Sequence, residues 1–462
     1  MQQTIYKNPS PQIKTEPPGP PTMPIVGNMI DFGRNPLGFY TYCARTYGDV
    51  VRLQFGSGQS SYLISNPHTI EEVLVQTGRR FAKGYQGDRL ITVFLGNGLV
   101  TSEGDFWRRQ RRLAQPAFHR KRITGYAEVM VAYTHRMVDK WRNGQVRDIH
   151  SEMLYLTQAI VSKTLFDADM QENAKTVGDA LEAAIMEYGK LMTSVFHHVL
   201  SFLPFQITTP TEQRLLEAMQ DIDNVVEQIV EERRKAPGDR GDLLSMLMEA
   251  RDEDGTGMTD QQLRDEVKTL FLAGHETTSN TLTWTFHLLM QHPDIVQKLE
   301  AEVDQVLGDR TVTLADLEQL TYTRHVLDES MRLYPPVWAI SRQATEDVEI
   351  EGYTIPAGSV LQMSQWTVHR DPRYFDDPEA FIPERWETIR ADLPKYAYFP
   401  FGGGPRLCIG NNFALMEATI ILASIVQHYQ LEALPKQEVA LQPAITLSPK
   451  GSLYARILTR TT

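Results

Sequence analysis

The chain of 462 residues contains only two cysteines, Cys43 and Cys408. A secreted disulfide framework and a zinc site of three or four cysteines are therefore excluded, and we expect a reducing, cytoplasmic setting. Long apolar runs are also missing. The polar, proline-rich N-terminus has neither the apolar core of a signal peptide nor the length of a transmembrane anchor. The formal net charge of −12 argues against nucleic acid as a partner.

Hydrophobic periodicity predicts a mainly α fold with a small β lobe. Alternating apolar residues around a Gly-Ser-Gly turn predict a hairpin near 49–66, and a second β-rich stretch lies near 342–370. Apolar residues at helical spacing predict long helices over 125–175, 177–203, 211–235 and 259–292. We expect a proline-rich N-terminal segment over 1–28 and a single domain over 29–462.

The helix predicted over 259–292 has an unusual centre. Its start carries a capping box formed by Thr259 and Gln262. Its middle turn, "AGHETT", places Gly274 before two threonines, although glycine costs about 1 kcal/mol relative to alanine inside a helix. Such a conflict marks a functional site, or it reflects close helix packing with a threonine hydroxyl bonded back to a carbonyl. The residues alone leave both interpretations open.

The stretch "FPFGGGPRLCIG" presents Cys408 on a permissive backbone. It matches neither a dinucleotide-binding loop nor a P-loop, and it lacks the local signatures of cysteine proteases. An inert buried cysteine would explain neither the glycines at 402–404 nor Arg406. Consecutive glycines let a backbone approach a flat ligand, a metal deprotonates a thiol, and arginine binds carboxylates. Haem carries both a metal and carboxylates and would account for all these features.

With these residues the chain resembles the cytochrome P-450 family, the haem-thiolate monooxygenases. The family signature F-x-x-G-x-R-x-C-x-G is matched at every position, by Phe401, Gly404, Arg406, Cys408 and Gly410. The resemblance extends from "PPGPP" near the N-terminus to "AITLSPKGSL" near the C-terminus. It implies the cytochrome P-450 fold, with haem b between the long central helix and the cysteine loop, and with Cys408 as the axial ligand of the iron.

The resemblance also assigns roles to residues far from the cysteine loop. "WRRQRRL" matches the pattern W-x-x-x-R, and an arginine follows "PPVWAIS". The implied haem contacts are Trp107, Arg111, Arg342, Phe401 and Arg406. "LDESMRLYPP" and "FIPERW" imply a buried network of Glu329, Arg332 and Arg385 that supports the core.

In the central helix, the family pattern A/G-G-x-D/E-T matches Ala273, Gly274, Glu276 and Thr277. It implies that the helix opens locally, that Thr277 stabilises oxygen bound at the iron and that Glu276 relays protons. Peroxygenases and hydroperoxide isomerases of this fold typically lose the acid–threonine pair, so the pair argues against that reaction class. A haem sensor without turnover and a thiol-dependent hydrolase are two further competing interpretations of the chain.

Substrate and electron donor are further expectations from the resemblance. We expect O2-dependent hydroxylation of an apolar long-chain fatty acid or terpenoid. The implied pocket residues are Leu95, Leu270, Val337, Trp338, Ala339, Ile445 and Leu447. No flavin module follows Cys408, so we expect electrons from a ferredoxin and its reductase. The expected basic docking face comprises Arg108, Arg109, Arg112 and the "HRKR" stretch. The stretch 199–212 is a candidate access lid.

Overall fold

The computed structural model describes residues 16–460 except for 57–58, 85–88, 169–173, 195–207, 236–237 and 253. Most of the candidate lid at 199–212 and the tip of the Gly-Ser-Gly turn therefore lie outside the described residues. The helices are α1 (Met29–Arg34), α2 (Pro36–Tyr47), α3 (Pro67–Val75), α4 (Arg89–Leu95), α5 (Gly104–Ala114), α6 (Arg120–Val138), α7 (Ile149–Phe166), α8 (Ala174–Thr193), α10 (Pro210–Lys235), α11 (Leu243–Glu249), α12 (Asp260–Leu289), α13 (Pro293–Leu307), α14 (Thr321–Leu333), α15 (Gln365–Val368) and α16 (Asn411–His428). None of these described helices has both the length and the apolar character that crossing a bilayer requires.

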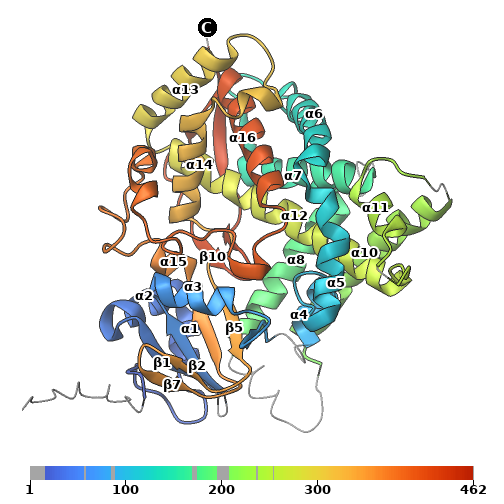
Figure 1. The fold of residues 1–462 in the computed structure, drawn as a ribbon. Coiled ribbons are helices and arrows are strands. Elements are labelled where there is room, and N and C mark those ends of the chain that lie inside the picture. Colours follow the sequence, from blue (N-terminus) through green and yellow to red (C-terminus); the bar gives the residue numbers. More distant parts are fainter. Residues whose placement is uncertain are drawn as a thin grey trace, which may run out of the picture.

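In the described part of the chain, the strands form one five-stranded sheet, one three-stranded sheet and two two-stranded sheets. They are β1 (Val50–Phe55), β2 (Gln59–Ile64), β3 (Phe81–Ala82), β4 (Val146–Asp148), β5 (Ile340–Ala344), β6 (Val348–Ile350), β7 (Tyr353–Ile355), β8 (Val360–Met363), β9 (Tyr429–Ala433), β10 (Leu441–Pro443), β11 (Leu447–Pro449) and β12 (Tyr454–Thr459). The large sheet has the order β1-β2-β8-β5-β3 and lies at one end of the molecule, with the helices above it in Figure 1. A mainly helical protein with a small β lobe is the predicted fold class, and it is confirmed.

The β lobe joins the two β-rich stretches that lie far apart in the sequence. The predicted hairpin is confirmed: β1 and β2 pair antiparallel, with Val50 opposite Ile64. Strand β2 then pairs in parallel with β8, so residues 61–64 lie beside residues 360–363. The N-terminal segment follows the outer edge of β1, where the Arg52 N–H donates to the Pro18 carbonyl at 2.8 Å. The predicted division at residue 28 stays a prediction.

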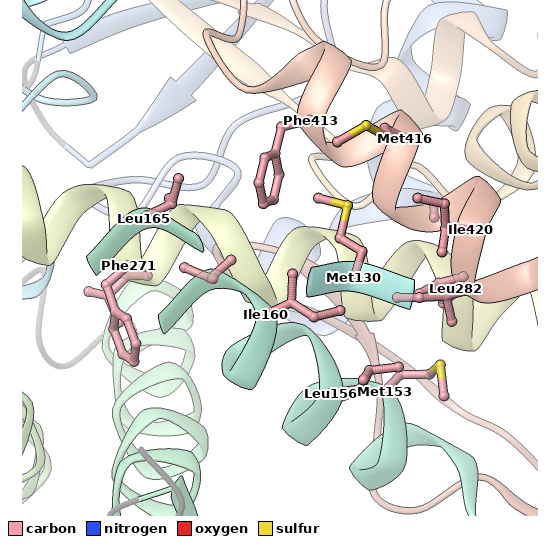
Figure 2. Close-up of a cluster of buried hydrophobic side chains, with 14 of the residues drawn as sticks. Met130, Met153, Leu156, Ile160, Leu165, Phe271, Leu282, Phe413, Met416 and Ile420 are labelled. Carbon is pink, nitrogen blue, oxygen red and sulfur yellow. The ribbon is translucent and has the colours of Figure 1, made fainter. Parts of the chain in front are cut away.

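Helix α12 crosses the centre of the helical part (Figure 1). The predicted capping box at Thr259 and Gln262 is present and fixes the start of the helix. Helix α7 packs along α12, and the core between them continues to α6 and α16, with methionine, leucine and isoleucine side chains facing one another in Figure 2. Leu282 and Ile160 are fully buried there.

The helical stretch predicted over 125–175 is wrong in one respect, because two helices and a strand occupy it. Helix α6 ends at Val138, β4 spans Val146–Asp148, and α7 begins at Ile149. The break contains Gly144, which has a φ of 78° and therefore turns the chain in a conformation that other residues adopt rarely. The stretch between the helices, "DKWRNGQVRD", has only Trp141 and Val146 as apolar residues and contains an Asn-Gly pair, which is a turn signal that the periodicity-based prediction did not take into account.

The predicted buried network of Glu329, Arg332 and Arg385 is confirmed. Arg332 and Arg385 each donate to the Glu329 carboxylate at 2.9 Å, and both members of the Glu329–Arg332 pair are inaccessible to solvent. The carboxylate also accepts the Trp386 indole N–H at 2.9 Å and the Ile382 backbone N–H at 3.0 Å. The network is saturated with hydrogen bonds, as a buried ion pair needs to be, and it ties α14 to the segment that leads to the cysteine loop.

Candidate active site

A cavity of about 370 Å³ lies between α12 and the loop that carries Cys408. Its size falls within the range typical of ligand pockets. All eight predicted catalytic and cofactor residues border it, although they come from distant parts of the sequence. These residues are Trp107, Arg111, Glu276, Thr277, Arg342, Phe401, Arg406 and Cys408.

The cysteine loop takes its shape from its glycines. Gly402 and Gly404 have φ values of 68° and 62°, where glycine is favoured. A Cβ atom on Gly404 would lie 2.0 Å from the carbonyl oxygen of Leu74 at the end of α3. The Cys408 N–H donates to the Phe401 carbonyl at 3.1 Å and closes the loop. The glycines therefore let the loop pack against α3 and hold Cys408 at the edge of the cavity.

Cys408 exposes surface to the cavity, while protein encloses it on the other sides. This enclosure raises the pKa of the thiol, and the Gly410 backbone N–H and the charges of Arg111 and Lys83 oppose the rise. The same groups would stabilise a thiolate. Without a metal, the raised pKa keeps the thiol protonated, whereas coordination by a metal deprotonates it directly.

Four cationic side chains, Lys83, Arg111, Arg342 and Arg406, gather on one side of the cavity. Arg406 pairs with the Glu103 carboxylate at 2.7 Å. Burial, followed by the charges of Arg342 and Arg406, holds the pKa of Lys83 well below its usual range. The cluster therefore favours an anionic ligand. A flat ligand with carboxylates at one edge and a metal facing a thiol fits these residues, and haem has that structure.

Lys83, a member of this cluster, and Glu103, the ion-pair partner of Arg406, were not predicted from the sequence. The Lys83 ammonium donates to the Val100 carbonyl at 2.8 Å, next to the residues that lead into α5. Arg406 also lies 3.9 Å from the centre of the Trp107 ring, a cation–π distance. Since Arg406 and Glu103 are 303 residues apart, no local motif could have indicated their pairing.

The local opening expected in the middle turn of α12 is not present, because the helix is continuous from Asp260 to Leu289. The Thr277 hydroxyl donates to the Ala273 carbonyl at 3.0 Å. A Cβ atom on Gly274 would lie 3.2 Å from a methyl group of Val161 on α7. The close helix packing and the back-bonded threonine hydroxyl that would explain this turn structurally are therefore both present. The turn nevertheless borders the cavity, so Thr277 and Glu276 are also placed where a functional site requires them.

Glu276 is a buried carboxyl group at the cavity wall, with 7% of its surface exposed. Burial raises its pKa to about 7, and a hydrogen bond from the Thr446 hydroxyl opposes the shift. A carboxyl with a pKa near neutrality both releases and accepts protons under ordinary conditions. Glu276 was predicted from the sequence, whereas its partner Thr446 was not.

Five of the seven expected pocket residues line the cavity: Leu95, Leu270, Val337, Ala339 and Ile445. Trp338 and Leu447 do not line it, and that expectation is corrected. Both pack into a separate apolar cluster between α2 and the large sheet. Trp338 stands between two cavity residues in an extended segment, where neighbouring side chains point in opposite directions.

The expected basic face is also corrected at one residue. Arg109 pairs with Asp252 at 2.7 Å and donates to the carbonyls of Thr256 and Gly257, so it anchors another segment of the chain. Arg108 and Arg112 are exposed on α5. The side chains of residues 120–122 in the "HRKR" stretch lie outside the described residues.

Comparison with known proteins agrees with this geometry. The family model described as Cytochrome P450 matches residues 17–454. Cyclooctatin synthase of Streptomyces melanosporofaciens is 36% identical over 432 residues, which cover 93% of each chain. Cyclooctat-9-en-7-ol 5-monooxygenase of the same organism is 35% identical, covering 90% of this chain and 89% of the relative. Pentalenene oxygenase of Streptomyces avermitilis is 33% identical, covering 96% and 97%.

The fold and the cavity define a haem-thiolate enzyme whose cysteine thiol borders a cavity beside a central helix. The chain belongs to the cytochrome P450 family. It is a monooxygenase with a haem-thiolate iron cofactor, and it uses O2 and electrons from redox partners, as members of this family do.

Proposed function

We propose that the protein hydroxylates an apolar terpenoid, using haem b held by the thiolate of Cys408. The observation that carries this proposal is the cavity in which one thiol, a cationic edge and an acid–threonine pair meet. Haem iron bound by a thiolate supplies the oxygen-activating chemistry of the reaction.

Each group of cavity residues has a distinct role in this proposal. Cys408 would provide the thiolate ligand of the haem iron, and the glycines before it would let the backbone approach the cofactor. Arg111, Arg342 and Arg406, with the Trp107 ring, would bind its carboxylates. Phe401 packs at the start of the loop. On the opposite side, Thr277 and Glu276 hold protons at the wall where oxygen is activated.

The cavity favours a neutral terpenoid over a fatty acid. Away from the cationic edge, its lining includes the apolar residues Ile91, Phe94, Leu95 and Leu270. The ionisable group on this side is Glu276, which would repel a fatty-acid carboxylate once it is charged. The names of three relatives, cyclooctatin synthase, cyclooctat-9-en-7-ol 5-monooxygenase and pentalenene oxygenase, are in keeping with a terpenoid substrate.

A ferredoxin and its reductase are the proposed electron donors, acting in the cytoplasm. The exposed side of α5 offers a groove of about 670 Å³ lined by Arg108 and Arg112 together with Trp107 and Arg111. The last two residues also border the haem cavity. An acidic protein docked over Arg108 and Arg112 would therefore lie close to the cofactor.

The first test is the carbon monoxide difference spectrum of the reduced holoenzyme. Wild type is expected to give the strongly red-shifted Soret band of thiolate-bound haem, and Cys408→Ser is expected to lose it. Cys43→Ala is the matched control, because Cys43 is buried in the apolar cluster between α2 and the large sheet, away from the haem cavity. Loss of the band in Cys43→Ala alone, or its retention in Cys408→Ser, would overturn the assignment of the ligand.

The second test is turnover with a ferredoxin, its reductase and NAD(P)H. Cyclic terpene hydrocarbons are expected to be hydroxylated, and long-chain fatty acids of similar carbon number are expected to react at least tenfold more slowly, because a charged headgroup is poorly accommodated. Faster turnover of the fatty acids would overturn the proposed substrate class while leaving the ligand assignment intact.

A further inference from the structure

The turn between β10 and β11 reaches into the protein beside the middle of α12. Thr446 in this turn is buried, with 4% of its surface exposed. Its hydroxyl donates to the Glu276 carboxyl and accepts a hydrogen bond from the Asn280 side-chain amide at 3.3 Å. Asn280 and Glu276 lie four residues apart on α12, so one hydroxyl connects both residues to the turn.

The backbone around Thr446 is fixed on both sides. The Trp338 indole donates to the Ala444 carbonyl at 2.9 Å. The Trp284 indole donates to the Leu447 carbonyl at 2.9 Å, and the Leu447 N–H donates to the Pro336 carbonyl at 2.8 Å. The Thr446 hydroxyl is therefore held in place by contacts independent of Glu276, which is what a group that orients another side chain requires.

Glu276 depends on this hydroxyl because it has no charged partner. Within the described ranges, no lysine, arginine or histidine forms an ion pair with its carboxylate, although basic side chains line the far edge of the same cavity. A buried carboxyl without a counter-charge is free to rotate away from the cavity unless a hydrogen bond fixes it. The adjacent residue Ile445 lines the cavity, so the turn that holds Glu276 also meets the substrate space.

We infer that Thr446 is a positioning residue for Glu276, which fixes the carboxyl at the cavity wall beside Thr277 so that protons are delivered there. The inference rests on the proposed function and deepens it. It assigns to the β10–β11 turn a part in the reaction in addition to shaping the pocket.

The test compares variants of the purified holoenzyme by infrared spectroscopy of the Glu276 carboxyl group. The carbonyl stretch of the protonated carboxyl is assigned by its loss in Glu276→Gln and is followed through a pH titration. In Thr446→Val, we expect the band to shift to higher frequency and the pKa to rise above the wild-type value of about 7, because the hydrogen bond favours the charged form. Thr446→Ser retains the hydroxyl and is expected to restore both readouts.

Turnover gives a second readout. In Thr446→Val, product formed per NAD(P)H is expected to fall about tenfold while hydrogen peroxide rises in its place, since a misplaced proton donor loses part of its catalytic effect. Ser448→Ala is the matched control, because it removes a hydroxyl from the adjoining strand β11 at a residue for which the structure shows no bond to Glu276. Thr446→Ala replaces Thr446→Val if the latter does not yield folded holoenzyme.

An unchanged band and an unchanged titration in Thr446→Val would overturn the inference, as would equal effects of Ser448→Ala and Thr446→Val. The infrared readout does not depend on turnover or on the identity of the axial ligand. A wild-type protein without the red-shifted carbon monoxide band would instead overturn the proposed function, so the two failures are distinguishable.

Discussion

Two glycines of the cysteine loop, Gly402 and Gly404, allow the stability cost of the same substitution to be compared at neighbouring positions. Gly402 and Gly404 have similar φ values, 68° and 62°. An alanine at either position adopts a left-handed conformation that costs about 1–2 kcal/mol. At Gly402, the nearest atom to a new Cβ is a methyl carbon of Ile340 at 3.9 Å, an ordinary contact. Gly402→Ala is therefore expected to cost little beyond the backbone term.

Gly404→Ala meets an additional obstacle. Its Cβ would lie 2.0 Å from the Leu74 carbonyl oxygen and 2.6 Å from the carbonyl carbon, both atoms of the α3 backbone. Either α3 or the loop must move by about 1 Å, and overpacking of this kind adds about 1–3 kcal/mol. The total expected for Gly404→Ala is about 2–5 kcal/mol, against about 1–2 kcal/mol for Gly402→Ala.

Thermal unfolding of the holoenzyme, followed by circular dichroism, measures the difference. For a chain of 462 residues, an unfolding entropy of about 2.1 cal/mol/K per residue means that a change of 1 kcal/mol in the free energy of unfolding shifts Tm by about 1 °C. Gly402→Ala should lower Tm by about 1–2 °C and Gly404→Ala by about 2–5 °C, with a weaker thiolate band in the carbon monoxide spectrum of the latter. Equal Tm losses and equal spectra for the two variants would refute the steric argument.

Two other buried carboxylates give contrasting predictions. Glu329→Ala leaves Arg332 charged in an inaccessible position, so we expect the free energy of unfolding to fall by about 3–5 kcal/mol. The yield of folded holoenzyme measures this loss. Glu384→Ala is the comparison: it removes a partly exposed ion pair with Lys298, and the free energy of unfolding should fall by less than about 1 kcal/mol. Glu417 is fully buried on α16, which raises its pKa well above the usual range. The unfolded chain releases this proton at lower pH than the folded chain, so folding stability falls as pH rises above the unfolded pKa, by about 1.4 kcal/mol per pH unit. Glu417→Gln has no proton to release and should not lose stability in this way. The Tm of the variant minus the Tm of wild type should therefore be larger at pH 8 than at pH 5. An equal difference at both pH values would contradict the raised pKa of Glu417.

The cysteine loop and the centre of α12 were predictable because their chemistry is local. The spacing between Phe401 and Gly410 lies within ten residues, and each residue type in it has a physical reason. Helical periodicity similarly located α10 and α12 to within three residues at each end. Short motifs and regular periods are properties of the chain that do not require the tertiary structure.

The contacts that complete the site were not predictable in this way. Thr446 and Glu276 are 170 residues apart, and although Ile445 and Leu447 beside Thr446 were expected pocket residues, nothing in the sequence pairs Thr446 with Glu276. The helix opening expected at Gly274 is absent, and Gly274 instead lies close to Val161 of the neighbouring helix α7 within a continuous α12. The break between α6 and α7 was missed for a different reason, because the Asn143-Gly144 turn signal was not weighed against the helical pattern on either side of it. In each case a tertiary contact or a single turn decided the outcome.

The parallel pairing of β2 with β8 has a consequence for the synthesis of the protein. Ile64 pairs with Met363, so the ribosome must add about 300 residues after β2 before its partner exists. At about 5–20 residues per second, this takes roughly 15–60 s. During that interval, the β1–β2 hairpin has an open edge and little stability of its own, because an isolated two-stranded hairpin is marginal in water. The first strands to leave the ribosome are therefore among the last to be completed, and a nascent chain stalled before residue 360 would present this edge to chaperones and proteases.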